Sequence, residues 1–457
     1  MRAKRIDDAT RCSRYAIKAK LTYGLALLFT AVLSGSVPGK TLAHAGENDS
    51  IEKRLPAAKA MSLQVMKLQE ELNHAAPGSR QAVLDELVAT LQARKQILLE
   101  LMEARTQSIL EIALPDSARE TLPRDMQGLV ERHETLEGTL EIHVADNFDL
   151  KVVRTAYVLI TDQGQEIALH FVRVPEGLQN NTRVQVKGVQ IEREMALESA
   201  SGGVLALSAE TPTSTLLTMA YKKTAVVLFN FQNNPVEPYT LDAARATTFT
   251  SAASANDWYQ EVSFGKIGLS GKVNVDGDVF GWYTIPYDNT TCTISTWVSA
   301  ANAAAAASGF SSADYDKLIY AFPQTDSCDW WGLGGGNAAK INGSFALKVI
   351  THELGHTFGL PHANTYTCYD ASGARVAIGT SCTSTEYGNV FDTMGIGTSG
   401  HFNNYFENWL GWFDPSAVQV ANGDGVYTIA PMETATGGVQ DLRIPRIVDP
   451  NGTVLRY

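Results

Sequence analysis

Residues 346–362 read ALKVITHELGHTFGLPH, and this stretch decides how the chain is interpreted. It contains the pattern H-E-x-x-H-x-x-G-x-x-H, in which His352 and His356 are four residues apart. Its first part reads as a helix, where side chains at this spacing leave the same face about 6 Å apart at Cβ. Gly359 can adopt the left-handed conformation that ends a helix and reverses the chain. That reversal would bring His362 back toward the other two imidazoles.

Three converging imidazoles suit one tetrahedral zinc ion, with roughly 2.0–2.1 Å per bond. Glu353 follows the first histidine, where the general base of a zinc hydrolase must sit. A lone histidine on a helix is more often an ordinary hydrogen-bonded residue, and H-E-x-x-H alone also arises by chance. Here three of the nine histidines fall within eleven residues, with Glu and Gly at the positions that the geometry requires. The sequence therefore predicts zinc ligands His352, His356 and His362, with Glu353 as the catalytic base.

The complete motif is that of the metzincin metallopeptidases, which carry a methionine turn beneath the zinc site some tens of residues further on. Residues 387–395 read YGNVFDTMG, and Met394 fits that place, although by itself it would be ordinary core filling. The chain resembles the gametolysin branch of the metzincins, secreted peptidases with a pro-region, over about residues 224–412. The segments that carry the resemblance beyond the zinc motif are 331–336, 341–345, 387–395, 401–405 and 409–412.

This resemblance implies a zinc-dependent endopeptidase with a zincin α/β catalytic domain and an extended polypeptide as its substrate. It also implies that residues 338–341 form the edge strand that pairs with the substrate backbone. The glycines at 334–336 either let a peptide approach or form a flexible loop. Some metzincins support the oxyanion with a tyrosine two residues after the turn methionine. Ile396 stands there, which leaves Tyr405 and His401 as the candidates.

Composition fits a globular chain of several domains. With 457 residues, of which 44% are hydrophobic and 19% charged, the chain has material for two or three domains. The net charge of −12 argues against nucleic acid, which requires a basic footprint. We expect an α+β monomer: a metzincin catalytic domain preceded by a helical hairpin and a small β-barrel pro-region.

Residues 1–45 have the layout of a secretory signal peptide. A basic region is followed by the apolar run 21–33 and by the small-residue site Ala43-His44-Ala45. A retained anchor is the alternative, but the apolar run is shorter than the roughly 20 residues that a spanning helix needs. We therefore expect cleavage after Ala45 and a secreted, extracellular protein without stable membrane insertion, with the periplasm or cell surface as alternatives.

The cysteines agree with export. Cys12 would leave with the signal peptide, and the four that remain all lie in the catalytic part. An even number in a secreted chain indicates disulfides. We expect the pairs Cys292–Cys328 and Cys368–Cys382. Four unpaired thiols or a second metal site are the alternatives, but no C-x-x-C spacing occurs to favour them.

The chain between the signal peptide and the catalytic domain shows two different hydrophobic patterns. Residues 46–130 place apolar side chains at three- and four-residue steps, with a break at Pro77-Gly78, and predict a helical hairpin. Residues 131–208 change to a period of two, which is typical of a small β-barrel or sandwich. We assign 213–413 to the catalytic domain and 414–457 to the start of a C-terminal β module that ends in mid-strand, as in a truncated product.

Three local features have two readings each. The pair Lys222-Lys223 follows a polar linker at 209–215 and is either a dibasic processing site or a solvated pair. Asp276 and Asp278 resemble a calcium loop, but their spacing and the missing distal Glu do not fit an EF-hand, so Ca²⁺ is the less favoured reading.

Latency is the third open feature. No cysteine stands between the signal peptide and Cys292, which excludes a cysteine from the pro-region as a zinc ligand. A carboxylate such as Asp146 or Asp149 could reach the zinc instead, and simple steric cover is an equal alternative.

Two functions of different classes follow. One is a secreted zinc endopeptidase that hydrolyses extracellular or cell-wall proteins. The other is a catalytically silent zincin-fold adhesion or wall-binding protein. Glu353 favours the peptidase, because a binding protein has no need of the base.

Overall fold

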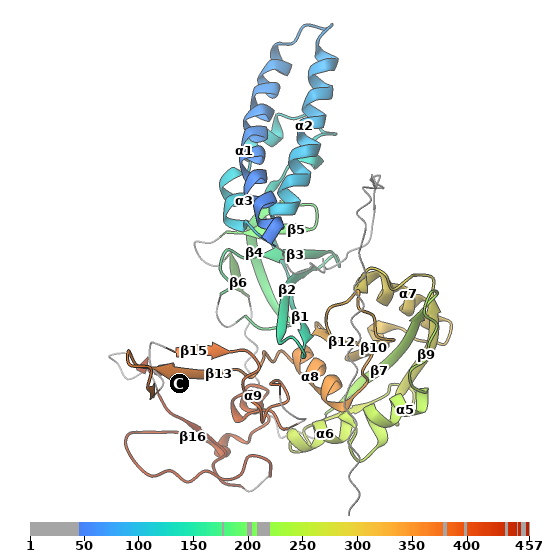
Figure 1. The fold of residues 1–457 in the computed structure, drawn as a ribbon, viewed down its shortest axis with the longest axis vertical. Helices are drawn as coiled ribbons and strands as arrows, with labels where there is room; N and C mark the ends of the chain where they lie inside the picture. The colour runs from blue at the N-terminus through green and yellow to red at the C-terminus, as the bar shows by residue number, and fades with distance from the viewer. Residues whose placement is uncertain are drawn as a thin grey trace, which may run out of the picture. The chain divides into compact units, whose positions relative to one another are not determined.

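The computed structural model describes residues 45–175, 178–198, 203–207, 220–377, 382–396, 400–434, 437–445, 447–448 and 454–456 (Figure 1). Residues 1–44 of the predicted signal peptide and the linker at 209–215 lie outside the described residues. Within them, no helix combines the length and the apolar composition needed to cross a membrane. Short helical turns lie at Gln127–Leu129, Ala246–Thr250, Ser312–Asp314 and Pro415–Ala417.

Two long helices, α1 (Ala45–His74) and α2 (Arg80–Leu101), form the expected antiparallel hairpin. Val65, Leu68 and Leu72 of α1 pack with Leu87 and Leu91 of α2. The same core cluster includes Leu114, Leu122, Met126 and Val130 from the segment that follows the hairpin. The second helix ends at Leu101, where the chain turns at 102–105 and resumes as α3 (Thr106–Ile112), followed by α4 (Asp116–Glu120). The turn lets Ile109 and Ile112 pack against strand residues Val189 and Ile191.

A buried ion pair joins the helices to the first strand. The Arg94 guanidinium on α2 donates to both carboxylate oxygens of Glu131, at 2.5 and 2.6 Å, and both side chains are buried. The same guanidinium donates to the Ser62 hydroxyl and the Ile112 carbonyl, and Glu131 accepts from the backbone N–H of Leu114. Because every charged group here is partnered, the pair holds the hairpin in place without an isolated buried charge.

Residues 132–197 form a closed barrel, as expected of this part of the chain. Its strands are β1 (Arg132–Asn147), β2 (Val152–Thr161), β3 (Glu166–His170), β4 (Thr182–Ile191) and β5 (Glu194–Leu197), with β6 (Val204–Ala206) attached to β4. The ladder runs β1–β2–β3–β5–β4 and returns from β4 to β1, so no edge remains open. Alternate residues such as Leu140, Leu159 and Val184 fill the interior.

The second part of the sheet belongs to the predicted catalytic region. Its strands are β7 (Ala220–Phe231), β8 (Ile267–Ser270), β9 (Asp278–Ile285), β10 (Lys317–Phe322), β11 (Gly332–Gly335) and β12 (Ala338–Asn342). They are parallel except β11, which runs antiparallel to β12. The expectation that 338–341 is the edge strand is therefore wrong. β12 lies between β10 and β11, and the glycine-rich stretch taken as a candidate loop is the outer strand.

Helices cover both faces of this sheet. They are α5 (Leu241–Arg245), α6 (Ala255–Val262), α7 (Ile294–Ala306), α8 (Leu347–Thr357) and α9 (Asn404–Trp409). Val226 and Leu228 of β7 pack in the same core as Ile350 and Leu354 of α8. Val227 and Phe229, which alternate with them, pack with Trp297 of α7. Burial on both faces explains why β7 reads as an unbroken apolar run.

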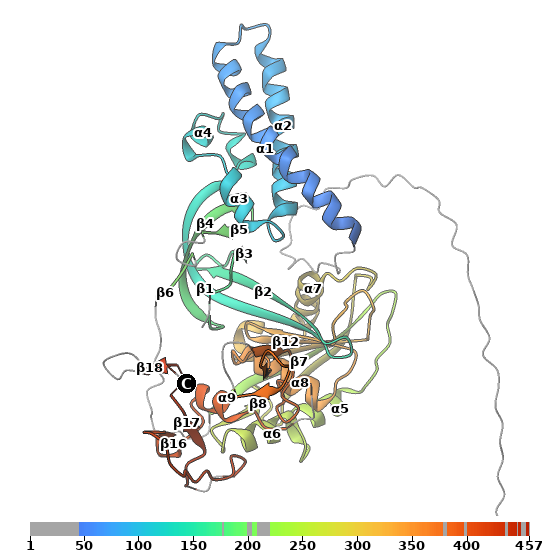
Figure 2. The same ribbon diagram turned by 60° about the vertical axis from the view of Figure 1, so that its left-hand side comes forward.

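The two parts share one mixed sheet. The last residues of β1, His143 to Asp146, pair antiparallel with β11, so the ladder of 12 strands passes without interruption from the barrel to the predicted catalytic region. Figure 2 allows the long β1 to be followed along its length. The described residues thus form a mixed α+β fold in which a barrel strand covers β11.

The C-terminal part consists of small sheets and one disulfide-linked loop. Its strands are β13 (Thr365–Tyr369), β14 (Arg375–Val376), β15 (Cys382–Thr385), β16 (Val418–Val420), β17 (Asp441–Arg443), β18 (Ile447–Val448) and β19 (Val454–Arg456). The expected disulfides Cys292–Cys328 and Cys368–Cys382 are both confirmed. The second joins residues that face each other on β13 and β15.

The suspected calcium loop is organised by its own backbone. The Asp278 carboxylate accepts hydrogen bonds from the backbone N–H groups of 272–274 and from the Tyr315 hydroxyl. Asp276 is exposed and does not join it. These contacts satisfy the carboxylate without a cation.

The dibasic pair also has a structural place. Lys222 and Lys223 lie inside β7, paired with Leu269 and Ser270 of β8. The backbone N–H of Lys223 donates to the Asp316 carboxylate. A protease could reach this pair only if the strand opened, which favours the reading as a solvated pair.

One buried acid outside the candidate site should make stability depend on pH. The Glu407 carboxyl on α9 is fully buried, and no described residue hydrogen-bonds to it. Burial, with the charges of Asp392 and Glu433, raises the pKa of Glu407 to about 9. The folded state therefore holds this proton above the pH at which the unfolded chain, with an ordinary carboxyl, has lost it. The free energy of unfolding should fall as pH rises from roughly 4 to the folded pKa.

Glu407→Gln should remove this dependence, since the amide stays neutral. Near pH 8 we expect the variant to be more stable than the native chain by a few kcal/mol, and near pH 4 the two should be similar. Thermal unfolding at pH 4 to 9 measures the difference. The exposed Glu237→Gln is the control and should leave the pH slope unchanged. Equal slopes for Glu407→Gln and the native chain would contradict the assignment.

Candidate metal centre

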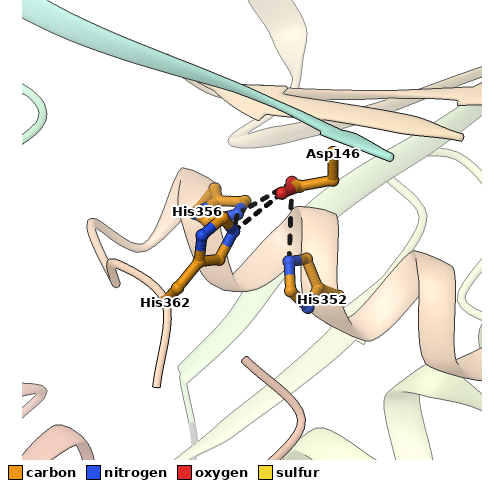
Figure 3. Close-up of side chains that lie close together, drawn as sticks. All are labelled: Asp146, His352, His356 and His362. Carbon is orange, nitrogen blue, oxygen red and sulfur yellow. Dashed lines mark hydrogen bonds and ion pairs between the residues drawn. The ribbon is translucent and has the colours of Figure 1, made fainter. Parts of the chain in front are cut away.

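The three histidines of the motif converge on one point, together with Asp146 from β1 (Figure 3). The ligand atoms that these four residues offer lie within 4.8 Å of one another, and all four side chains are buried. The Asp146 carboxylate lies 2.7 Å from Nε2 of His362, 3.1 Å from Nε2 of His356 and 3.5 Å from Nε2 of His352. This cluster could hold a metal ion. It is the one group of this kind found among the described residues.

Helix α8 carries His352 and His356, and the segment at 392–394 packs against it. A Cβ on Gly355 would lie 2.4 Å from Sδ of Met394, so only glycine lets the methionine pack against this turn of the helix. The Met394 side chain is fully buried, and its N–H donates to the Asp392 carboxylate. The carbonyl of the preceding Thr393 accepts a hydrogen bond of 2.8 Å from Nδ1 of His352. Met394 thus lies directly against the helix that carries His352 and His356.

A reversal at Gly359 positions the third histidine. Gly359 has φ of 91°, in the left-handed region that the sequence required. Its N–H donates to the His356 carbonyl, and the next N–H donates to the Gly355 carbonyl, which ends the helix. The chain then returns so that Nε2 of His362 lies 3.1 Å from Nε2 of His356.

The hydrogen bonds of the three rings show whether they fit a cation. Each Nδ1 faces an acceptor: the Thr393 carbonyl for His352, the Leu360 carbonyl at 2.8 Å for His356, and the Glu386 carboxylate at 2.5 Å for His362. Each Nδ1 is therefore placed to carry a proton, and each ring in its neutral form turns an Nε2 lone pair inward. Three lone pairs and a carboxylate that face one another in a buried site repel unless a cation lies between them. The donor set fits a divalent metal.

The pKa values of Asp146, His352 and His362 are shifted by burial and by their charged neighbours. Burial would raise the pKa of Asp146, but the imidazoles of His356 and His352 outweigh it and hold that pKa well below its usual range. Burial lowers the pKa of His352 to about 4. For His362 burial acts in the same direction, yet the carboxylates of Asp146 and Glu386 raise its pKa to about 9. The negative charges of Asp146 and Glu386 therefore favour a positive charge at this position.

Glu353 is buried beside the cluster without a hydrogen-bond partner. Both carboxylate oxygens are inaccessible and make no hydrogen bond among the described residues; the Gly334 N–H faces the carboxylate but outside hydrogen-bond geometry. Burial and the nearby charge of Asp146 raise the pKa of Glu353 well above its usual value. A Cβ on Gly332 would lie 2.1 Å from Oε1 of Glu353, so β11 passes directly over this carboxyl group. Desolvation of this kind is typical of a carboxylate that exchanges protons near neutral pH.

Of the two candidate carboxylates, Asp146 and Asp149, Asp146 reaches the cluster. Asp146 pairs with Gly332 of β11 and points into the cluster, whereas Asp149 is exposed in the turn after β1. The Trp331 N–H donates to the Asp146 carbonyl at 2.7 Å and helps to fix this end of the strand.

The two oxyanion candidates lie elsewhere. His401 lies 2.9 Å from the Glu261 carboxylate, and the Tyr405 side chain is 62% exposed and packs on Phe406 and Trp409. Sequence reasoning missed Tyr387, whose hydroxyl donates to Asp146, and Glu386, which orients His362. Both stand in or beside the stretch that contains the methionine turn, but no spacing rule marks them.

Comparison with known proteins leaves the family open. No protein-family model matches this chain, and no curated protein matches it.

Metal retention tests the centre directly. The native chain should keep one divalent ion after dialysis, and His356→Gln should lose it because two imidazoles and a carboxylate remain. Glu386→Gln should weaken metal affinity about 10–100-fold, since an outer partner of a ligand is lost. Elemental analysis after dialysis against graded metal buffers gives the affinities.

The matched control is His170→Gln, whose imidazole lies 2.5 Å from Glu194 in the barrel. It should retain the ion as the native chain does. Unchanged metal content in His356→Gln would exclude this centre.

Proposed function

We propose that this protein is a secreted zinc-dependent endopeptidase of the gametolysin-like metzincin type, made as a proenzyme. The observation that carries the proposal is the placement of Glu353. A desolvated carboxyl group without a hydrogen-bond partner lies beside three imidazoles whose Nε2 atoms converge. A protein that only binds other molecules gains nothing from such a group, which costs free energy to bury.

Zinc is the metal that best suits these residues. Three neutral imidazoles are typical ligands of catalytic zinc sites, which keep a fourth position for water or substrate. Zinc bound here would polarise a substrate carbonyl and lower the pKa of water toward about 7. The reversal at Gly359 ahead of His362 and the packing of Met394 beneath the motif helix support the same assignment.

In the proposed hydrolysis, Glu353 carries out both proton transfers. Glu353 accepts a proton from the attacking water, and the water oxygen forms a bond to the scissile carbonyl carbon. As the C–N bond breaks, Glu353 returns the proton to the leaving nitrogen, so that a carboxylate and an amine are released. The raised pKa of Glu353 suits both transfers, because the group can hold the proton between them.

Strand β1 explains how the same chain is kept inactive. Its residues His143 to Asp146 occupy the β11 edge, where an extended substrate would form its main-chain hydrogen bonds. Asp146 at the same time would offer a bound zinc ion a fourth protein ligand in place of water, so that the site would be closed. The pro-region therefore blocks both the metal and the substrate strand.

The remaining parts of the proposal are supported by the sheet and the disulfides. A parallel sheet with one antiparallel outer strand over the motif helix is the arrangement expected of a zincin catalytic domain. Two disulfides favour an oxidising compartment, in agreement with the signal-like N-terminus. Extracellular or cell-wall proteins are the substrate class that fits this location.

Hydrolysis can be tested on the full chain. A specific protease site is inserted in the linker at 209–215, Asp146→Ala is introduced to open the centre, and the chain is cleaved at the inserted site. This activated chain should hydrolyse casein, and a zinc chelator should abolish hydrolysis. Adding Glu353→Gln should reduce the rate at least about 100-fold, because general base catalysis typically contributes 10²–10⁴-fold. The variant should still hold one zinc ion.

Retained hydrolysis in the Glu353→Gln chain would refute the base. An activated chain that binds zinc but cleaves no protein substrate would favour the silent binding protein instead.

Latency can be tested with the uncleaved chain. Asp146→Ala should raise hydrolysis of a short peptide at least about tenfold over the native chain, because a charge-assisted contact at the metal is lost. Asp149→Ala is the matched control, since Asp149 is a neighbouring but exposed carboxylate. Equal rates for the two variants would mean that latency comes from steric cover by β1 alone.

A further inference from the structure

We propose that Tyr387 is a catalytic residue, whose hydroxyl donates a hydrogen bond to the carbonyl oxygen of the scissile peptide as that oxygen gains negative charge. This inference rests on the proposed function and assigns a donor that the sequence pattern leaves unassigned. In the present structure the same hydroxyl holds Asp146, so it has one role in the latent form and another in the active form.

The position of the hydroxyl carries the inference. Tyr387 donates to Oδ1 of Asp146, the same oxygen that lies 2.7 Å from Nε2 of His362. The other oxygen, Oδ2, lies 3.1 Å from Nε2 of His356. The carboxylate therefore occupies the point where an oxygen of the substrate must lie to react. When β1 leaves, an oxygen that replaces Oδ1 meets the Tyr387 hydroxyl.

The ring is fixed by its neighbours. It is fully buried, and its centroid lies 4.1 Å from that of the His362 imidazole at an interplanar angle of 35°. His362 is in turn oriented by Glu386, the residue before Tyr387. A donor held in this way needs no rearrangement when charge develops, which is the property of an effective oxyanion donor.

The backbone at Tyr387 shows that this position is imposed. Its φ is 55°, in the left-handed region that bulky residues rarely adopt. The N–H donates to the Asn364 side chain, and the carbonyl accepts from the N–H of Ile396. Such a conformation is kept only where the surrounding contacts over-determine it, and it is common at functional sites. Here it aims a phenol into the cluster.

One acidic side chain, Glu353, and one phenol, Tyr387, then lie beside the cluster with separate roles. Glu353 lies under Gly332, the residue that faces Asp146 across the β1–β11 ladder. Tyr387 donates to the same Asp146 from the segment that precedes the methionine turn. Glu353 is placed to move the proton, while Tyr387 keeps its own proton and only donates a hydrogen bond.

The inference also accounts for a departure from the family pattern. Some metzincins use a tyrosine two residues after the turn methionine, and this chain has Ile396 there. Tyr387 lies seven residues before Met394. The fold therefore brings a phenol to the metal centre from the opposite side of the methionine turn in sequence.

The test uses Tyr387→Phe, which keeps the ring and removes only the hydroxyl. In the activated chain we expect kcat to fall about 10²–10³-fold, the usual effect of losing one oxyanion donor, with KM changed less than about twofold. Affinity for a phosphinic peptide, a mimic of the tetrahedral transition state, should fall by a similar factor. Affinity for the peptide product and zinc content should not change.

The uncleaved chain with its native Asp146 provides a second readout. Without the hydroxyl, Asp146 is held less firmly, so a chelator should remove zinc about tenfold faster from Tyr387→Phe than from the native chain. Loss of latency together with loss of kcat is a signature that a merely structural role would not give. Tyr369→Phe, a half-exposed tyrosine on β13, is the control and should match its parent in every assay.

The outcomes separate this inference from the proposed function. If the activated parent chain cleaves no substrate, the proposed function fails and Tyr387 has no catalytic role. If the parent is active and Tyr387→Phe keeps kcat within threefold, or binds the phosphinic peptide as tightly, only the present inference is overturned. If the variant folds poorly, a crystal structure of the activated parent with the phosphinic peptide decides. A Tyr387 hydroxyl within about 3 Å of a phosphinyl oxygen supports the role, and one beyond hydrogen-bond reach excludes it.

Discussion

The arrangement depends on three imidazoles whose outward N–H groups are all taken by fixed acceptors. The Thr393 carbonyl, the Leu360 carbonyl and the Glu386 carboxylate each bind one Nδ1–H, which leaves the Nε2 lone pairs directed at a common point. All three acceptors come from the chain that follows the motif helix. Much of that segment can be understood as an outer shell that sets tautomer and ring angle, and such shells decide metal affinity as strongly as the ligands themselves.

What the sequence predicted well was local. Helix geometry relates His352 to His356, and the left-handed turn at Gly359 brings back His362, so contiguous residues sufficed. The helical hairpin, the closed barrel and both disulfides also followed from periodicity and cysteine order. β9 and the break between α2 and α3 were missed, because both depend on packing against distant strands.

What the sequence could not predict was long-range. The pairing of β1 with β11 joins residues almost two hundred positions apart, and the glycines of β11 look like a loop until α8 lies against them. Asp146 and Asp149 were both candidate ligands from the sequence. The structure separates them, because Asp146 on β1 pairs with Gly332 and Asp149 lies in the turn after that strand. A shift of one residue would turn Asp146 to the opposite face. Tyr387 reaches the site through a left-handed backbone that no propensity favours.

Strand β1 belongs both to the barrel and to the sheet of the catalytic region, and this affects how the barrel could dissociate from the catalytic region. Its first half is locked into a barrel without open edges, and its last residues cover β11. Cutting the connection between the barrel and the catalytic region would leave two chains held together by the β1–β11 pair, by the buried Asp146 carboxylate and by further contacts such as the Arg154–Asp329 ion pair. The two chains would then form a complex with a dissociation constant. Activation would then become a matter of dilution or of destruction of the barrel, and the liberated barrel could rebind and inhibit neighbouring molecules wherever protein is concentrated.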